Sequence, residues 1–210
     1  MAKNANPVVT SPKGILKYPH LNTPDTKFNS KGVYSTKLLL DPEEGEKFAR
    51  GLDIFYEQAL KAGKAESPKM KAADKPYHFD EEAGKWEFNF KMNASYTSKK
   101  TGEEIPLKPS LFDAKNKPLK EGTKITGGSI ARVACEVVPF AMKGPVGAGI
   151  SLRLKAVQVI DLKVWDTDPS AFGFEVEEGG YEDPDGEDAW DTNGFSDESS
   201  DDDDSNDGDF

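Results

Sequence analysis

The charged residues of this chain are divided unevenly between its two ends. Residues 164–210 contain nineteen Asp and Glu residues and no Lys or Arg, whereas residues 1–163 contain all 27 Lys and Arg residues and the other nineteen acids. The net charges are therefore +8 and −19. From Glu175 onward the sequence is mostly Glu, Asp, Gly, Ser, Asn and Pro, and this composition buries too little apolar surface to offset the entropy lost on folding. We expect one folded domain, residues 1–165, followed by a disordered acidic tail, residues 166–210.

Residues 1–165 show patterns typical of β-strands. Strands are expected at residues 14–18, 32–40, 86–97, 105–113, 130–140 and 150–164. The clearest is 86–97, where apolar and polar side chains alternate, so that Trp86, Phe88 and Phe90 are expected in a core. In the last strand the apolar residues move from even-numbered to odd-numbered positions near Ala156, which indicates a β-bulge or a strand buried on both faces.

A single helix is expected after the second strand. Asp41 suits the N-cap and Pro42 the first helical position. Apolar residues then recur at helical spacing, and Gly63 is expected to end the helix. These apolar residues are Phe48, Leu52, Phe55, Tyr56, Ala59 and Leu60. The polar residues 64–76 are expected to form a long, mobile, basic loop.

These elements predict an all-β fold. Five or six antiparallel strands, strongly bent, with one helix to cap an open end are typical of a small Greek-key barrel of the OB-fold type. Strands and helices do not alternate along the sequence, so nothing indicates a parallel sheet. The sequence also lacks a signal-peptide-like N-terminus and any apolar run of the roughly 18 residues that a membrane span needs. We therefore expect an intracellular protein that makes no membrane contact.

Nothing in the sequence indicates an active site. His20 and His78 are the only histidines and have no zinc-ligand spacing, and no glycine motif for nucleotides is present. Cys135 lies among valines and is expected to be a packed thiol. The tail matches only the first half of a calcium loop, because the Glu required at position 12 would lie beyond Phe210. We expect neither catalysis nor a metal or cofactor.

The basic domain has the side chains that single-stranded nucleic acid requires, namely cations for phosphates and rings for bases. We single out Phe140, because it follows Pro139 at a strand end and precedes a glycine-rich turn, where burial is least assured. The predicted nucleic-acid-binding residues are Lys31, Tyr77, Lys91, Tyr96, Lys99, Lys100, Phe112, Arg132, Phe140 and Lys143.

Several segments resemble the single-stranded DNA-binding proteins of T7-type bacteriophages. They are Asn29-Ser-Lys-Gly-Val-Tyr34, Phe88-Asn-Phe-Lys-Met-Asn-Ala-Ser-Tyr96, Gly127-Gly-Ser129, Val138-Pro-Phe140 before Val146-Gly-Ala148, and the terminal Asp207-Gly-Asp-Phe210. The resemblance implies an OB-fold in which the helix follows the second strand. It also implies that Phe140 matches a base-stacking position and Lys31 a basic DNA contact. The family has further aromatic residues near the positions of Asn93 and Met142, where this chain departs from it.

The same resemblance implies a role in replication, recombination and strand annealing in the cytoplasm of an infected bacterium. The tail would recruit the phage DNA polymerase and primase-helicase, and its negative charge would compete with DNA for the basic domain. The predicted partner-binding residues of the tail are Trp190, Phe195, Asp207, Asp209 and Phe210. An acidic tail that binds the groove of its own chain would equally bind the groove of a neighbouring chain. The sequence therefore leaves open whether the protein is a monomer or a homodimer. The alternatives are a chaperone-like protein-interaction module that binds no DNA, and an OB-type enzyme subunit, for which no nucleophile or metal site is present.

Overall fold

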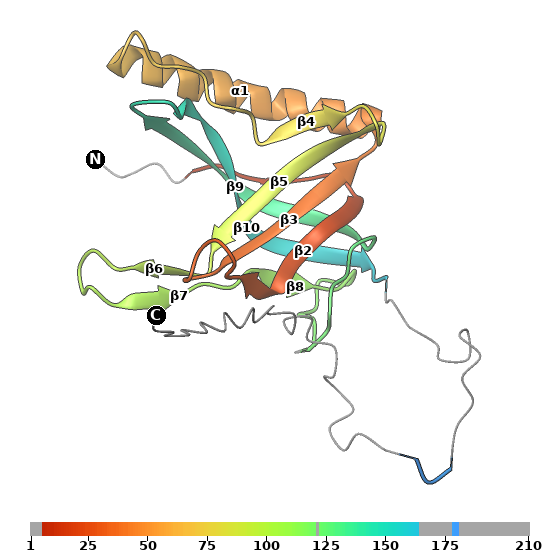
Figure 1. Ribbon diagram of the computed structural model, residues 1–210. Helices are drawn as coiled ribbons and strands as arrows, with labels where there is room; N and C mark the ends of the chain where they lie inside the picture. Colours follow the sequence, from red (N-terminus) through yellow and green to blue (C-terminus); the bar gives the residue numbers. More distant parts are fainter. Residues whose placement is uncertain (1–5, 121, 164–177, 181–210) are drawn as a thin grey trace, which may run out of the picture. The chain divides into compact units, whose positions relative to one another are not determined.

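The computed structural model describes residues 6–120, 122–163 and 178–180 (Figure 1). The chain divides into two units, Met1–Asp166 and Thr167–Phe210, and the fold described below is that of the first. Its elements are β1 (Val8–Thr10), β2 (Gly14–Asp25), β3 (Val33–Leu40), α1 (Pro42–Glu66), β4 (Tyr77–Asp80), β5 (Lys85–Asn93), β6 (Ser95–Thr97), β7 (Glu104–Pro106), β8 (Ser110–Phe112), β9 (Ile130–Met142) and β10 (Gly147–Asp161). None of the helices in the described residues is long and apolar enough to span a membrane.

Five of these strands close into a barrel. β2 pairs with β3, β3 with β5, β5 with β10, β10 with β9, and β9 again with β2. Four of the five pairs are antiparallel, and β5 with β10 is parallel. This closed Greek-key arrangement with one helix is the OB-type fold that the sequence predicts.

The expectation of antiparallel pairing throughout is wrong at β10, which runs parallel to both β5 and β8. Parallel neighbours need a crossover of a dozen or more residues, usually a helix. Here the crossover from β5 to β10 consists of the β6–β7 hairpin, loops and two further strands, β8 and β9, so no alternation of strands and helices marks it in the sequence.

The core follows the strand alternation closely. Phe88 and Phe90 are fully buried, while Trp86 is half-buried at the edge of the core. β9 buries Ala131, Val133, Cys135 and Val137, as expected. Burial raises the pKa of the Cys135 thiol to about 12, so this cysteine is a neutral packed side chain at physiological pH. The register of β10 against β9 shifts between Leu154 and Ala156, which confirms the predicted bulge.

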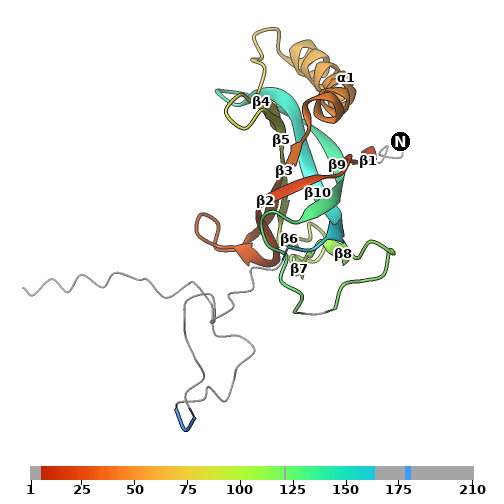
Figure 2. The same ribbon diagram turned by 90° about the vertical axis from the view of Figure 1, so that its right-hand side faces the viewer.

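Helix α1 lies across one end of the barrel (Figures 1 and 2). Asp41 precedes it in an extended conformation, but its carboxylate accepts a hydrogen bond from Lys85 Nζ at 2.5 Å and does not cap a backbone N–H. The predicted end at Gly63 is wrong, because the helix continues to Glu66. Gly63 is a packing residue: a Cβ at this position would lie 2.5 Å from Cβ of Ala148. The buried face of the helix comprises Gly45, Ala49, Leu52, Tyr56, Ala59 and Gly63.

The segment 64–76 is not the mobile loop that its polarity suggests. Its first three residues belong to α1, and Met70 and Ala73 are buried. Backbone hydrogen bonds of 2.9 Å join Ala73 N to the carbonyl of Ala148, and Ala148 N to the carbonyl of Lys71. The segment therefore packs beside the start of β10, and its Lys75 is held by an ion pair with Asp53.

Two glycines of α1 provide a test of this packing. A Gly51→Ala substitution meets no atom within 4 Å and removes backbone entropy from the unfolded chain, so it should stabilise the protein by about 0.5–1 kcal/mol. A Gly63→Ala substitution adds the same methyl group against Ala148 and should destabilise the protein by about 1–3 kcal/mol. Urea denaturation followed by circular dichroism measures both, and stabilisation by both substitutions would contradict the packing described.

Candidate nucleic-acid interface

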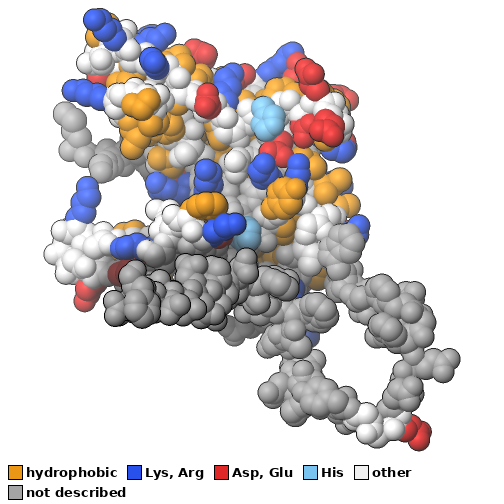
Figure 3. All heavy atoms as spheres, in the orientation of Figure 1, with side chains coloured by type: hydrophobic (Ala, Val, Ile, Leu, Met, Phe, Trp, Pro, Cys, Tyr) orange, Lys and Arg blue, Asp and Glu red, His pale blue; other side chains and the backbone are white. Residues whose placement is uncertain are grey.

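A groove of about 910 Å³ runs along the outer surface of the barrel where β5 and β10 lie side by side. The two strands are paired at only two positions, Leu152 with Phe90 and Arg153 with Lys91. In Figure 3, Lys and Arg side chains lie along a hollow above the β6–β7 hairpin. The lining residues are Asp74, Lys75, Pro76, Asn89, Lys91, Met92, Asn93, Ser95, Tyr96, Leu107, Glu136, Ile150, Ser151, Leu152, Arg153 and Lys155.

The groove is cationic and contains an exposed ring. Its four cations are Lys75, Lys91, Arg153 and Lys155, all exposed, and its two carboxylates are Asp74 and Glu136. Within the described residues Lys91 and Lys155 make no ion pair, and Arg153 Nη1 lies 3.5 Å from Glu136 Oε2. The ring of Tyr96 is 49% exposed. Cations with free donors beside a solvent-facing ring are what phosphates and bases require.

Strand register places two of these cations, Arg153 and Lys91, in one row with polar residues of β3 and β2. Arg153 of β10 is paired with Lys91 of β5, Lys91 with Ser35 of β3, and Ser35 with His20 of β2. Side chains of directly paired residues point to the same face of a sheet. The row therefore crosses the outer surface of the barrel from the groove onto β2.

Lys75 is held in position from the helix. Its Nζ lies 2.5 Å from Asp53 Oδ1, and the same oxygen accepts a hydrogen bond from the Tyr77 hydroxyl at 2.6 Å. Burial of Asp53 would raise the pKa of its carboxyl, but the hydrogen bonds from Lys75 and Tyr77 outweigh burial and lower this pKa. Asp53 is therefore ionised at neutral pH and anchors Lys75 at the edge of the groove.

Comparison with known proteins identifies the family. Residues 10–162 match the family described as single-stranded DNA-binding protein, bacteriophage T7. The chain belongs to this family. The single-stranded DNA-binding protein of Escherichia phage T7 is 31% identical over 168 residues, which cover 73% of this chain and 72% of the relative. That of Enterobacteria phage T3 is 28% identical over 186 residues, covering 81% and 80%.

Solved structures confirm the OB-type fold of this family member. The crystal structure of gp2.5, a single-stranded DNA-binding protein encoded by bacteriophage T7, superposes with a TM-score of 0.69 at 28% identity, covering 85% of this chain and 100% of that chain. The single-stranded DNA-binding protein of bacteriophage Enc34 in complex with single-stranded DNA has a TM-score of 0.50 at 15% identity, covering 75% and 88%. This second likeness concerns the fold alone. The resemblance to T7-type proteins seen in the sequence is thereby confirmed.

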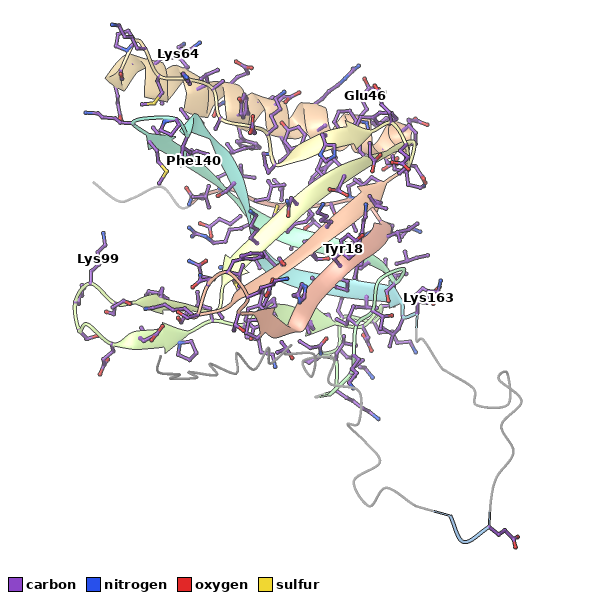
Figure 4. The ribbon with its side chains drawn as sticks, in the orientation of Figure 1. Tyr18, Glu46, Lys64, Lys99, Phe140 and Lys163 are labelled. Atoms are coloured by element: carbon purple, nitrogen blue, oxygen red, sulfur yellow. The ribbon has the colours of Figure 1, made fainter. Side chains whose placement is uncertain are left out.

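Four of the predicted residues lie in the groove or on the hairpin beside it, and a fifth, Lys31, contacts that hairpin. Lys91 and Tyr96 line the groove. Backbone bonds from Ala94 N to the Gly32 carbonyl and from Leu107 N to the Ala94 carbonyl mark the point where the expected strand 86–97 divides and the β6–β7 hairpin begins. Lys99 and Lys100 lie in the turn of that hairpin, and Figure 4 places Lys99 at its tip. Lys31 reaches the hairpin through an ion pair of 3.2 Å with Glu104.

Phe140 lies near the end of β9, and Lys143 lies in the turn between β9 and β10. Figure 4 places Phe140 on the part of this hairpin near α1. Phe140 is half-buried and paired with Gly149, and its Cζ would lie 3.4 Å from a Cβ at Gly149. A Cβ at Gly149 would also lie 3.0 Å from Cβ of Ala73 and 3.4 Å from Cε2 of Tyr56, both buried residues, so the Phe140 ring packs over Gly149 beside α1 and the segment 64–76. Its role as a stacking residue stays a prediction.

Three predicted residues are not brought to the groove. Tyr77 is only 4% exposed and stacks on Phe88 with ring centroids 5.5 Å apart, so its prediction as a base-stacking ring is wrong. Phe112 is half-buried on β8, which pairs with β10 at residues 156–158, beyond the groove. Arg132 lines a separate depression with Ile15 and Leu39.

The predicted tail residues, Trp190, Phe195, Asp207, Asp209 and Phe210, lie outside the described residues. Within the described part of the chain, no group of three or more His, Cys, Asp or Glu side chains could hold a metal ion.

Sequence reasoning missed Lys75, Arg153, Lys155 and Phe28. Arg153 lies between the buried Leu152 and Leu154, so the alternation along the strand could have predicted that it faces outward. Lys75 was missed because it was expected in a mobile loop. Phe28 lies in the β2–β3 loop, is 90% exposed and has Lys27 Nζ 5.7 Å from its ring centroid. An aromatic residue between polar residues and beside a lysine was the signal for this ring.

A buried carboxylate orders the neighbouring part of this outer face. Glu87 on β5 is 4% exposed and accepts hydrogen bonds from Lys37 at 2.6 Å and from Lys17 at 3.2 Å. Burial would raise the pKa of Glu87, but the two lysines outweigh burial and lower it below 4.5. Glu87 thus fixes two lysine side chains on β2 and β3.

Replacing Glu87 should make stability depend less on pH. Because the folded-state pKa is lowered, ionised Glu87 stabilises the fold above its ordinary pKa, and this contribution is lost as pH falls through the folded value. A Glu87→Gln substitution should cost about 1–2 kcal/mol at pH 7. The difference from the original protein should shrink toward pH 3 in urea titrations. The exposed Glu103→Gln is the matched control, and an equal cost for both substitutions at pH 7 would contradict the role assigned to Glu87.

Proposed function

We propose that this protein binds single-stranded DNA along the groove between β5 and β10. The observation that carries the proposal is the group of exposed cations that line one groove together with the exposed Tyr96, in a chain of this family. Lys91, Arg153 and Lys155 would neutralise phosphates, and Tyr96 would stack on a base. Binding of this kind tolerates any sequence, because every base has a π face.

The loops at the ends of the groove extend the proposed site. In OB-folds, oligonucleotides commonly contact the second and third barrel strands and the loops joining strands one to two and four to five. In this barrel those loops are residues 26–32, with Phe28 and Lys31, and residues 143–146, beside Phe140. These positions fit the base-stacking role expected for Phe140 and the phosphate contact expected for Lys31.

We assign the protein a coating and annealing role in phage replication and recombination, within the cytoplasm of the infected bacterium, and no catalytic step. The chain's similarity to phage single-stranded DNA-binding proteins supports this assignment. Its acidic tail would recruit the phage DNA polymerase and primase-helicase, with Phe210 and the other tail rings as contacts. A homodimer formed through exchanged tails is part of the same proposal.

The charge distribution supports a second role for the tail. Residues 164–210 carry nineteen acids, and residues 1–163 have a net charge of +8. A linked polyanion competes with DNA at a high effective concentration, and salt weakens this competition. DNA and the tail would therefore exchange for the same cations.

Groove cations should control both affinity and its salt dependence. Replacing Arg153 by Ala should weaken binding of a fluorescein-labelled (dT)20 about three- to tenfold at about 50 mM NaCl and reduce the log-log salt slope by about 0.7, the value for one phosphate on a single strand. Fluorescence anisotropy over a series of NaCl concentrations measures both. The control is Lys61→Ala, which changes the charge equally on an exposed position of α1. Equal loss in the two variants would refute binding in the groove.

Removing residues 176–210 should strengthen DNA binding at low salt, by about tenfold, and the gain should fade as salt rises. The same deletion should abolish recruitment of a replication partner in pull-down experiments. Unchanged affinity at low salt would refute competition by the tail. If the shortened protein bound no oligonucleotide at all, the chaperone-like alternative would replace DNA binding.

A further inference from the structure

Tyr18 has an unusual backbone for a residue in the middle of a strand. Its φ is +50°, and among the described residues only Asn116 is another non-glycine residue with positive φ. For a side chain with a Cβ this left-handed conformation costs free energy, and such outliers persist where the surroundings or a function require them. The ring is 66% exposed and points away from the core (Figure 4).

The strain follows from a β-bulge in β2. Leu16 and Leu21 are both buried in the core, yet they are five residues apart, and strict alternation would send one of them to the outer face. One extra residue between them resolves this conflict, and the β2–β3 register indeed shifts between Lys17 and His20. A bulge of this type redirects a side chain, and here the redirected side chain is Tyr18.

The core requires the bulge but not an aromatic ring at it. With two-thirds of its surface in solvent, Tyr18 contributes little to burial, and glycine would adopt the same φ without strain. Lys17 Nζ lies 5.6 Å from the centroid of the ring. The sequence therefore carries an exposed aromatic ring, at a cost in backbone energy, beside a cation.

The surroundings of Tyr18 contain both lysines and carboxylates. Lys17 and Lys37 share the buried carboxylate of Glu87, and Asp80 balances the remaining positive charge, so this cluster has no net charge. Both lysine side chains keep about a third of their surface in solvent. Asp80 also attracts Lys17. Figure 3 shows hydrophobic and cationic side chains next to each other on this face.

The ring is connected to the groove by the outer surface of β3. His20 is paired with Ser35, and Ser35 with Lys91, which lines the groove. Adjacent strands are about 4.8 Å apart, so β2 and β5 are separated by about 10 Å. The intervening outward positions, Ser35 and Lys37, are polar, so no apolar ridge interrupts this surface.

We propose that Tyr18 is a base-stacking residue for single-stranded nucleic acid that leaves the groove and crosses β3 onto β2. This inference rests on the proposed function of the groove and gives the bound strand a direction across the barrel strands. Lys37 and Lys17 would face the phosphates on this path, and the Tyr18 ring would take one base without sequence preference. A short oligonucleotide would fill the groove alone, and a longer one would also reach Tyr18.

The test compares two lengths of labelled oligothymidine, about 6 and about 20 nucleotides, on the full chain by anisotropy. Tyr18→Ala should weaken binding of the long oligonucleotide about tenfold, within the range of one lost stacking contact, and leave the short one unchanged. Tyr18→Phe should bind as the original protein does. Tyr18→Gly should lose as much affinity as Tyr18→Ala while being more stable in urea, because glycine relieves the strain. This pair separates loss of the ring from damage to the fold.

Photocrosslinking gives an independent measurement. A long oligonucleotide with bromodeoxyuridine should crosslink to the peptide that contains Tyr18, and the Arg153→Ala variant should reduce crosslinking. If Tyr18→Ala binds both lengths normally while Arg153→Ala weakens both, the inference about Tyr18 is wrong and the groove proposal stands. If Arg153→Ala has no effect on either length, the groove proposal itself is wrong.

Discussion

The parallel contact between β5 and β10 is the constraint on which both the barrel and its proposed binding surface depend. Leu152 and Phe90 face the core at this contact, and Arg153 and Lys91 project outward at the next position. Since the two strands pair at only these two positions, they close the barrel and then diverge, which leaves the groove between them. The same pairing thus supplies core packing on one face and adjacent cations on the other.

Two carboxylates hold three of the lysines on the outer surface in position. Asp53 holds Lys75 from the helix, and Glu87 holds Lys17 and Lys37 from within the sheet. Burial would raise the pKa of each carboxylate, but Lys75 and Tyr77 at Asp53, and the two lysines at Glu87, outweigh burial and lower it, so both carboxylates are ionised at neutral pH. Lys91 and Lys155, by contrast, have no ion pair within the described residues. The proposed interface therefore combines lysines of fixed position with lysines free to meet phosphates.

Local patterns predicted the elements whose environment is simple. The alternation of apolar and polar residues predicted which side chains of β5 and β9 are buried. A shift of the apolar residues from even-numbered to odd-numbered positions located the bulge of β10. The same reasoning failed where a distant segment determines the role of a residue. Gly63 was expected to end the helix, yet it lies inside it because Ala148 packs against it. Tyr77 was expected to be exposed, yet it packs on Phe88 because β4 pairs with β5 below the helix.

The sequence by itself determined the class of the protein. The separation of charge, the strand alternation and the single amphipathic helix indicated an OB-type barrel with a basic surface and an acidic tail, and short motifs indicated the family. Only the tertiary structure decided which cations lie together, since Lys75, Lys91 and Arg153 are brought to one groove by a parallel crossover that leaves no periodic signal. It likewise revealed Tyr18, because a positive φ at a bulge depends on two buried leucines that must face one core. Periodicity reports which way a side chain points along its own strand, and strand pairing decides what lies next to it.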